Sequence, residues 1–294
     1  MRDFDIFTDT CSDLPIDYVK EKGLQFARLT CSYNGQTYYD DFGQSLSHKQ
    51  FFDDVRNGVV PLTSQPSVDE FYQKFKSIVD SGKDILYICV STGLSGTENS
   101  ATIAKDMILE EKPEAKIAIV NVLTASLGQG IMVMKAFEMK EEGKSMDEIV
   151  DYMESNKQRL NTFMTVDDLN HLKRGGRLSS AAAIIGIILH IKPTLMIDTE
   201  GKVAVIGKAR GRKSSINKLA ELVTERIENA EEQIIGICHG DCLEEALKLK
   251  EIILEKIKVK VKDVIINFTG PAVGTHGGPG NLAVFFMGRD RSII

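Results

Sequence analysis

Residues 84–97 read Asp84-Ile85-Leu86-Tyr87-Ile88-Cys89-Val90-Ser91-Thr92-Gly93-Leu94-Ser95-Gly96-Thr97, and Glu98-Asn99-Ser100-Ala101 follows. The first seven residues have the composition of a buried strand, and a helical run begins at Glu98. Apart from Leu94, the turn between them contains small hydroxyl and glycine residues, which leave backbone N–H groups uncovered at the positive end of the helix dipole. The stretch therefore predicts a strand, a turn that can bind a carboxylate or phosphate, and a helix.

Short apolar strands alternate with amphipathic helices through the first half of the chain. We expect strands at residues 4–8, 24–32, 85–90 and 116–120, and helices at residues 51–56, 68–81, 98–110, 128–142 and 146–157. This alternation is typical of a mostly parallel sheet that is covered by helices on both faces. Ligands of such sheets bind at the carboxyl ends of the strands, and the turn at residues 91–97 lies at such an end.

The alternation becomes looser after about residue 158. There we expect strands at residues 162–166, 193–198, 203–206, 234–239, 261–268 and 282–287, and helices at residues 215–230 and 243–257. The sequence therefore predicts an α/β protein with two domains. The first is a mostly parallel three-layer α/β/α domain at residues 1–158, and the second is a smaller α/β domain at residues 159–294.

Composition and charge exclude several classes of protein. The chain has 294 residues, of which 43% are apolar and 27% charged, as in soluble globular proteins. The net charge of -6 argues against non-specific binding to nucleic acid or anionic membranes, because both depend on many cationic contacts to phosphate. The N-terminal residues lack the apolar region of a signal peptide, so we expect a cytoplasmic protein.

The cysteines and the longest apolar run point to the interior of the protein. The cysteines are odd in number and lack C-x-x-C spacing, which favours reduced thiols; they are Cys11, Cys31, Cys89, Cys238 and Cys242. Residues 238–242, Cys-His-Gly-Asp-Cys, match no zinc spacing, so we expect no metal site. Residues 181–189 are apolar but too few to cross a bilayer, and we expect them to lie inside the protein or to line an apolar cavity.

Hydroxyl groups near two helix starts are candidate ligand contacts. Ser95 fits a capping box with Glu98, and its hydroxyl proton remains free to donate to an anion. Ser67 fits the same pattern with Glu70, so we expect Ser67 to serve as a helix cap. The hydroxyl groups of Thr63 and Ser64, just before it, have no such role and could donate hydrogen bonds to a ligand at the same end of the expected sheet.

A glycine-rich segment near the C-terminus contains a further candidate. Residues 270–280 include five glycines and two prolines, as is usual for a turn. A turn does not explain the presence of His276. The segment is neither a Walker A loop nor a dinucleotide fingerprint. We therefore expect His276 to contact a ligand.

Two basic segments remain. Lys173-Arg174-Gly175-Gly176-Arg177 precedes the apolar run, so cationic donors and an apolar stretch together suit an amphiphile such as a fatty acid. His190, within the apolar stretch, is expected to be a core histidine. A second group precedes an expected helix, where cations oppose the helix dipole, and we expect it to dock a partner protein or a phosphate; its members are Lys208, Arg210, Arg212 and Lys213.

Two alternatives stay open at this point. Gly93-Leu94-Ser95-Gly96-Thr97 departs from the hydrolase pattern Gly-x-Ser-x-Gly only at its fifth position. A serine hydrolase of lipid esters, with Ser95 as nucleophile and His276 as base, is one alternative. A regulator that contacts DNA through residues 208–213 is the other.

Several segments, in this order, resemble the DegV family of bacterial fatty-acid-binding proteins. The resemblance spans the whole chain and rests on Thr8-Asp9-Thr10-Cys11-Ser12-Asp13-Leu14-Pro15, Thr63-Ser64-Gln65-Pro66-Ser67, Gly93-Leu94-Ser95-Gly96-Thr97, Ala125-Ser126-Leu127-Gly128-Gln129-Gly130, Asp168-Leu169, Leu172-Lys173-Arg174-Gly175-Gly176-Arg177, Ile191-Lys192-Pro193, His239-Gly240-Asp241 and Gly274-Thr275-His276-Gly277-Gly278-Pro279-Gly280. The family's Asp-Ser before the Ala-Ser-x-Gly segment is Asn121-Val122 here.

The resemblance implies a two-domain α/β protein that buries one long-chain fatty acid in a tunnel, with the carboxylate at the domain interface. It implies a binding subunit without cofactor or ATP site, which presents the fatty acid to a separate ATP-dependent kinase subunit for acyl phosphate formation. Transient membrane contact is compatible with this role, and nucleic acid binding is not expected. The implied carboxylate contacts are Thr63 and Ser95, with Ser64, Gly96, Arg174 and His276 close by, and the expected tunnel residues are Ile184, Ile185, Ile188 and Leu189.

Overall fold

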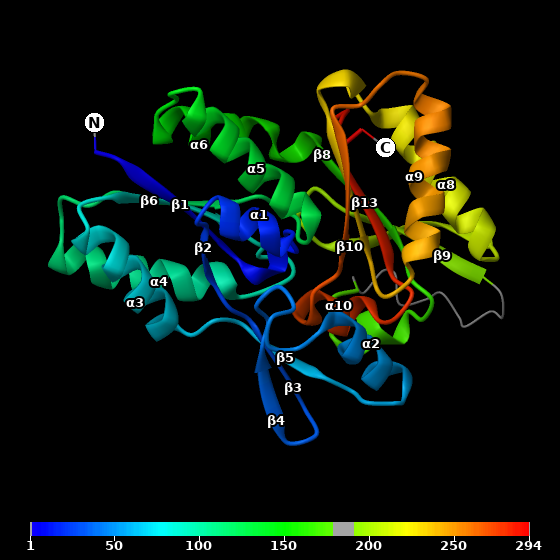
Figure 1. The fold of residues 1–294 in the computed structure, drawn as a ribbon, viewed down its shortest axis with the longest axis horizontal. Helices are drawn as coiled ribbons and strands as arrows, with labels where there is room; N and C mark the ends of the chain where they lie inside the picture. The colour runs from blue at the N-terminus through cyan, green and yellow to red at the C-terminus, as the bar shows by residue number, and fades with distance from the viewer. Residues whose placement is uncertain (1, 179–190, 294) are drawn as a thin grey trace.

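The computed structural model of the protein describes residues 2–178 and 191–293, which form three sheets and the helices that pack on them (Figure 1). The expected tunnel residues, and His190, lie outside the described residues. Within the described residues, no helix combines the length and the apolar character that a membrane span requires. The α/β class and the arrangement in two domains are confirmed.

The first sheet is parallel and has the strand order β2-β1-β6-β7. Helices α3 and α4 cover one face and α1, α5 and α6 the other, which gives the three layers that the alternation predicted (Figure 1). Every residue of the central strand β6 is buried, as expected for a strand covered on both faces. The elements are β1 (Phe4–Asp9), α1 (Ile16–Glu21), β2 (Gln25–Ala27), α3 (Val68–Asp80), β6 (Asp84–Cys89), α4 (Thr97–Glu111), β7 (Ile117–Asn121), α5 (Leu127–Glu141) and α6 (Met146–Asn156).

The second sheet is mixed, with the strand order β10-β9-β8-β13-β11-β12. Among the strand pairs of this sheet in the described part of the chain, β11 and β12 run parallel and the others antiparallel. Helices α8 and α9 pack on one face, and α5 contacts β11 and β13 as well as the first sheet, so that α5 lies between the two sheets (Figure 1). The elements are β8 (Leu160–Thr165), β9 (Ile191–Ile197), β10 (Val203–Arg210), α8 (Arg212–Arg226), β11 (Ile234–His239), α9 (Leu243–Ile257), β12 (Asp263–Phe268) and β13 (Leu282–Met287).

The third sheet is small and antiparallel, with the strand order β4-β3-β5. Together with α2 it packs against α10, which comes from the C-terminal part (Figure 1). The elements are β3 (Thr30–Tyr33), β4 (Gln36–Tyr39), α2 (His48–Arg56), β5 (Leu62–Ser64) and α10 (Pro271–Gly277). The expected boundary at residue 158 falls between the strands of the two large sheets. Since residues 30–64 pack on α10 from the C-terminal part, a division of the protein into domains at residue 158 remains a prediction.

Three local expectations are corrected by the structure. Residues 24–32 form two strands, because the backbone N–H groups of Arg28 and Leu29 donate to the Glu70 carboxylate and the Thr10 hydroxyl and not to a neighbouring strand. Residues 270–280 contain helix α10 where a turn was expected, and Pro271 at its first position suits a helix start. Strand β10 continues to Arg210, so that Lys208 and Arg210 belong to a strand.

The cap at Ser67 is confirmed in part. Its hydroxyl accepts a hydrogen bond from the N–H of Glu70 at 3.1 Å. The Glu70 carboxylate, however, accepts from Arg28 and does not complete a capping box.

The turn after β6 docks against the hairpin between β9 and β10. The Ser91 hydroxyl donates to the carbonyl of Gly201 at 2.8 Å. A Cβ atom at Gly93 would lie 2.7 Å from the Gly201 oxygen and 2.9 Å from the Glu200 oxygen. Since both are backbone atoms, they cannot swing aside as a flexible side chain would, and glycine is required for this contact between the two large sheets.

We predict that Gly93→Ala lowers the free energy of unfolding by about 1–3 kcal/mol, the usual cost of overpacking. Unfolding in urea, followed by circular dichroism, measures the change. Gly207→Ala is the control, because the nearest atom to an added Cβ there lies 3.8 Å away. Equal free energies of unfolding for the two variants would show that the backbone around Gly93 accommodates a Cβ atom and would contradict the prediction.

Candidate functional site

A cavity of about 380 Å³ lies between the two large sheets. The turns after β6 and β7 contribute to its wall, as do β5, β8, β10, β13 and α10. The lining residues are Cys11, Leu29, Thr63, Ser64, Gln65, Val90, Leu94, Ser95, Thr124, Ala125, Ser126, Thr162, Met164, Val166, Leu172, Arg177, Ile197, Val203, Thr269, Ala272, Val273, His276, Gly277, Asn281, Ala283 and Phe285.

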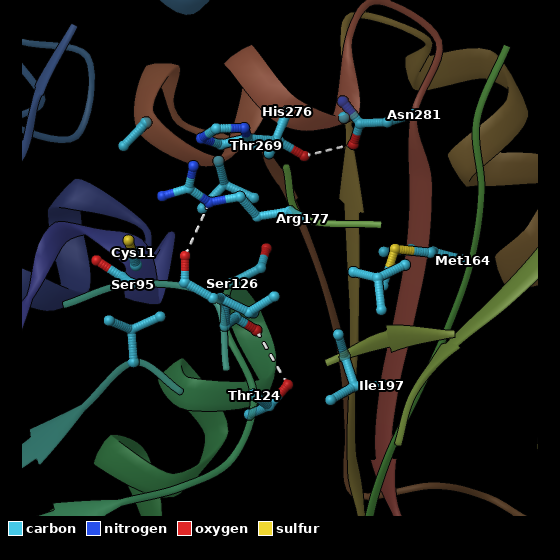
Figure 2. Close-up of a pocket in the computed structure, with 18 of the residues that line it drawn as sticks. Cys11, Ser95, Thr124, Ser126, Met164, Arg177, Ile197, Thr269, His276 and Asn281 are labelled. Atoms are coloured by element: carbon cyan, nitrogen blue, oxygen red, sulfur yellow. Dashed lines mark hydrogen bonds between the residues drawn. The ribbon is translucent and has the colours of Figure 1, made fainter. Parts of the chain in front are cut away.

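Arg177 and His276 lie together at one end of this cavity, and Ser95 lies nearby (Figure 2). Nε2 of His276 is 3.1 Å from Oγ1 of Thr63, a hydrogen bond between α10 and β5. Nε of Arg177 donates to the carbonyl of Leu94 at 2.9 Å, which fixes the guanidinium beside the turn after β6. Hydroxyl groups, an imidazole and one guanidinium therefore converge from four separate segments: β5, the turn after β6, the segment after residue 174, and α10.

The His276 side chain is held neutral by its surroundings. Burial lowers its pKa from 6.5 to about 4, and the nearby positive charge of Arg177 acts in the same direction. A neutral imidazole carries one N–H donor and one acceptor nitrogen. Within the described residues, Nδ1 of His276 is buried without a hydrogen-bond partner. A Cβ atom added at Gly175 would lie only 2.0 Å from this nitrogen, so glycine at this position leaves room for the ring.

The capping box expected at Ser95 is wrong. The N-cap of α4 is Gly96, and the Ser95 hydroxyl accepts from the N–H of Thr97 at 3.3 Å and pairs with the Thr97 hydroxyl at 2.7 Å. The N–H of Ser95 already donates to the carbonyl of Ser91, so it has no free donor for the Glu98 carboxylate. When Thr97 donates both bonds, the Ser95 hydroxyl proton is free to point into the cavity.

Apolar side chains make up much of the remaining wall. Met164 and Val166 follow Thr162 at every second position, so that one face of β8 and of its continuation lines the cavity. Ile197, Val203 and further apolar residues line it as well. An apolar cavity with a few convergent polar groups is the usual form of a small-molecule site, and this one suits an anionic group joined to an apolar body.

The structure brings together Thr63, Ser64, Ser95 and His276, all of which line the cavity. Gly96 does not line it, but a Cβ atom added at Gly96 would lie 2.4 Å from Oε1 of Gln65, which does.

Arg174, by contrast, is exposed and bonds with Nδ1 of His171 at 3.1 Å. It lines a second cavity of about 160 Å³, which Thr63, Arg177 and His276 also line. These three side chains therefore separate the large cavity from the small one. Arg177 is the arginine of this segment that lines the large cavity.

The basic group at residues 208–213 is divided by the structure. Lys208, Arg210 and Lys213 are exposed. Arg212 is only 17% exposed and donates to the Glu245 carboxylate at 2.6 Å, so this cation supports the packing of α8 on α9.

Neither hydrolase chemistry nor a metal site is supported by the contacts. Ser95 bonds with Thr97 and His276 with Thr63, so that in residues 2–178 and 191–293 the serine and the histidine are not paired with each other. The same residues contain no group of three or more side chains that could hold a metal ion. All five cysteines are free thiols, as expected.

Two buried carboxyl groups that the sequence analysis did not single out support the site. Asp13 and Asp40 accept hydrogen bonds from the N–H groups of Gly270 and Ala272 at 2.9 and 3.0 Å, at the start of α10. They therefore fix the helix that carries His276. Burial raises the pKa of Asp40 to about 7. Asp13 could have been suspected from the sequence because it follows shortly after the first strand, whereas no pattern in the sequence marks Asp40.

Comparisons with known proteins agree with this geometry. Residues 3–289 match the family model described as "Uncharacterised protein, DegV family". A DegV domain-containing protein from Clostridium perfringens is 44% identical over 288 residues, which are 98% of each chain.

Solved structures extend the similarity to the whole fold. A fatty-acid-binding DegV family protein from Thermus thermophilus has a TM-score of 0.89 at 28% identity, covering 98% of this chain and 100% of that one. A fatty-acid-binding DegV family protein from Streptococcus agalactiae has a TM-score of 0.85 at 30% identity, with the same coverage. The family match, the relatives and the shared fold lead to one conclusion: the chain belongs to the DegV family.

Proposed function

We propose that this protein binds one long-chain fatty acid, with the carboxylate at the polar end of the 380 Å³ cavity and the acyl chain along its apolar wall. The observation that carries the proposal is the convergence of Thr63, Ser95, Arg177 and His276 at one end of a buried apolar cavity. The fatty acids bound by the relatives from Thermus thermophilus and Streptococcus agalactiae support the same class of ligand.

Each polar group has a defined part in this proposal. Arg177 supplies the positive charge, and the Ser95 hydroxyl supplies a neutral donor. Because His276 is neutral, it orients the Thr63 hydroxyl without adding a second charge. Ser64 lines the cavity and is a further donor at this end, and Arg174 acts from the outer cavity.

The free energies of the two kinds of contact indicate that the polar end of the cavity selects the ligand. Burial of about 15 methylene groups at roughly 0.8 kcal/mol each gives on the order of 12 kcal/mol of transfer from water. A lipid bilayer offers the chain nearly the same environment, so the cavity gains little over a membrane. Hydrogen bonds to a charged carboxylate, about 1.5–3 kcal/mol apiece, then decide which molecule is retained and how it is oriented.

We further propose that the protein is a binding subunit and not a self-sufficient enzyme. It would present the carboxylate to a separate ATP-dependent kinase subunit, through the small outer cavity that Thr63, Arg174 and His276 line. The exposed cations Lys208, Arg210 and Lys213 are the docking contacts we propose for that subunit. Since ATP is available in the cytoplasm, we place this role there, with transient membrane contact for loading.

Denaturing extraction and mass spectrometry of the freshly purified protein test the proposal most simply. We expect close to one long-chain fatty acid per chain. The double variant Thr63→Val, Ser95→Ala should bind the same fatty acid about 10- to 1,000-fold more weakly, because it loses one or two hydrogen bonds to a charged group.

Ser145→Ala is the matched control, because Ser145 caps α6 outside the cavity. It should lower stability by about 0.5–2 kcal/mol and leave fatty acid affinity unchanged. An empty wild-type protein, or equal affinity in the double variant, would contradict the proposal. Labelling of Ser95 by a fluorophosphonate would indicate a hydrolase instead.

The titration of His276 gives an independent prediction. In the ligand-free protein its NMR signals should titrate near pH 4. A bound carboxylate should raise this pKa by favouring the charged ring, and Arg177→Gln should raise it by removing a positive neighbour. Because folding lowers this pKa from 6.5, the contribution to stability is complete above pH 6.5 and is lost as the pH falls through about 4. An unchanged pKa on fatty acid addition would place the ligand elsewhere.

A further inference from the structure

Two threonines that are distant in the sequence meet in the wall of the large cavity. Thr124 lies in the turn between β7 and α5, and Thr162 lies in β8. Their hydroxyl oxygens are 3.0 Å apart, which makes a hydrogen bond between them. Both residues line the cavity, and they are 0% and 2% exposed.

The pair is distant from the polar end of the cavity. Figure 2 shows Thr124 on the opposite side of the site from His276 and Arg177. Ile197 and Met164, both apolar lining residues, lie on the side of the cavity that faces Thr124 (Figure 2). A ligand whose carboxylate contacts Arg177 would therefore meet the two hydroxyls along its chain.

The pair has unused hydrogen-bonding capacity. Two hydroxyl groups carry two protons, and the bond between them uses one. The other proton can reach the carbonyl of Ala125, but at 3.4 Å, beyond the usual range for a hydroxyl donor. The bond between Thr124 and Thr162 ties the two sheets together, and this structural role accounts for only one of the two donors.

We propose that Thr124 and Thr162 form a polar subsite for fatty acids that carry a hydroxyl or keto oxygen along the chain. The inference rests on the proposed fatty acid site and specifies which class of fatty acid that site prefers. An oxygen buried against an apolar wall without a partner is costly, and the free proton of the pair offsets that cost at one position along the chain. An unsubstituted chain passes the pair while the two hydroxyls stay bonded to each other.

The test compares dissociation constants of stearic acid and of a positional series of hydroxystearic acids. In the wild-type protein, one positional isomer should bind more tightly than the others. Thr162→Val keeps the shape of the side chain and removes its hydroxyl, so it should weaken that isomer about 3- to 10-fold, the effect of one net hydrogen bond. The loss for that isomer should exceed any change in the affinity for stearic acid, so that the ratio of the two dissociation constants is the quantity compared.

Two variants control for structural effects. Thr162→Ser retains the hydroxyl and should keep the positional preference. Thr165→Val makes the same substitution in β8 at a buried residue that does not line the cavity, and it should leave every ratio of affinities unchanged. If Thr162→Val does not fold, Thr124→Val provides the same comparison from the other partner of the bond.

The outcomes separate this inference from the proposed function. No positional preference in the wild-type protein, or an equal loss for all acids in Thr162→Val, would overturn the subsite and leave a simple tie between the sheets. Failure of the wild-type protein to bind stearic acid and every hydroxystearic acid would overturn the fatty acid site itself.

Discussion

The hydrogen bond between Thr63 and His276 joins residues 213 positions apart in the chain, and the polar end of the cavity depends on it. Thr63 belongs to a short strand of the small sheet, and His276 to a short helix near the C-terminus. Asp13 and Asp40 hold the first N–H groups of that helix. Neither large sheet builds the site alone, because the N-terminal part supplies hydroxyls and carboxylates and the C-terminal part supplies the imidazole and the guanidinium.

The same arrangement explains how a polar site exists inside an apolar cavity. Burial keeps His276 neutral and raises the pKa of Asp40, so charges are few where the dielectric is low. Arg177 is the charged side chain among the cavity residues of the described chain, and it is anchored through the carbonyl of Leu94. A carboxylate that enters would find one fixed positive charge and neutral donors, which orient it without a second buried cation.

Much of the fold follows from the sequence, and local patterns explain why. The apolar run from Ile85 to Val90 and the turn after it are decided by near neighbours, so strand, turn and helix appear where expected. The single strand expected at residues 24–32 breaks because Glu70 and Thr10, distant in sequence, take its backbone donors. Contacts of this kind leave no periodic signal.

Part of the candidate site was also predictable from the sequence. Thr63, Ser95 and His276 stand out as polar residues in turns, and all three line the cavity. Arg174 and Arg177 share one basic segment, and no pattern in the sequence distinguishes Arg177, which lines the large cavity, from Arg174, which lines only the small one. The pairing of Thr124 with Thr162 depends on how the two sheets pack, which the sequence pattern does not encode.

The most direct test of the account is the carbon-13 signal of a carboxyl-labelled long-chain fatty acid bound to the protein, followed as the pH is lowered. We predict a single signal of an ionised carboxylate that persists well below the pH at which the same acid titrates in lipid vesicles, because Arg177 and the neutral donors favour the charged form. A carboxyl group that is protonated at neutral pH, or that titrates as it does in vesicles, would contradict a carboxylate held at the polar end of this cavity.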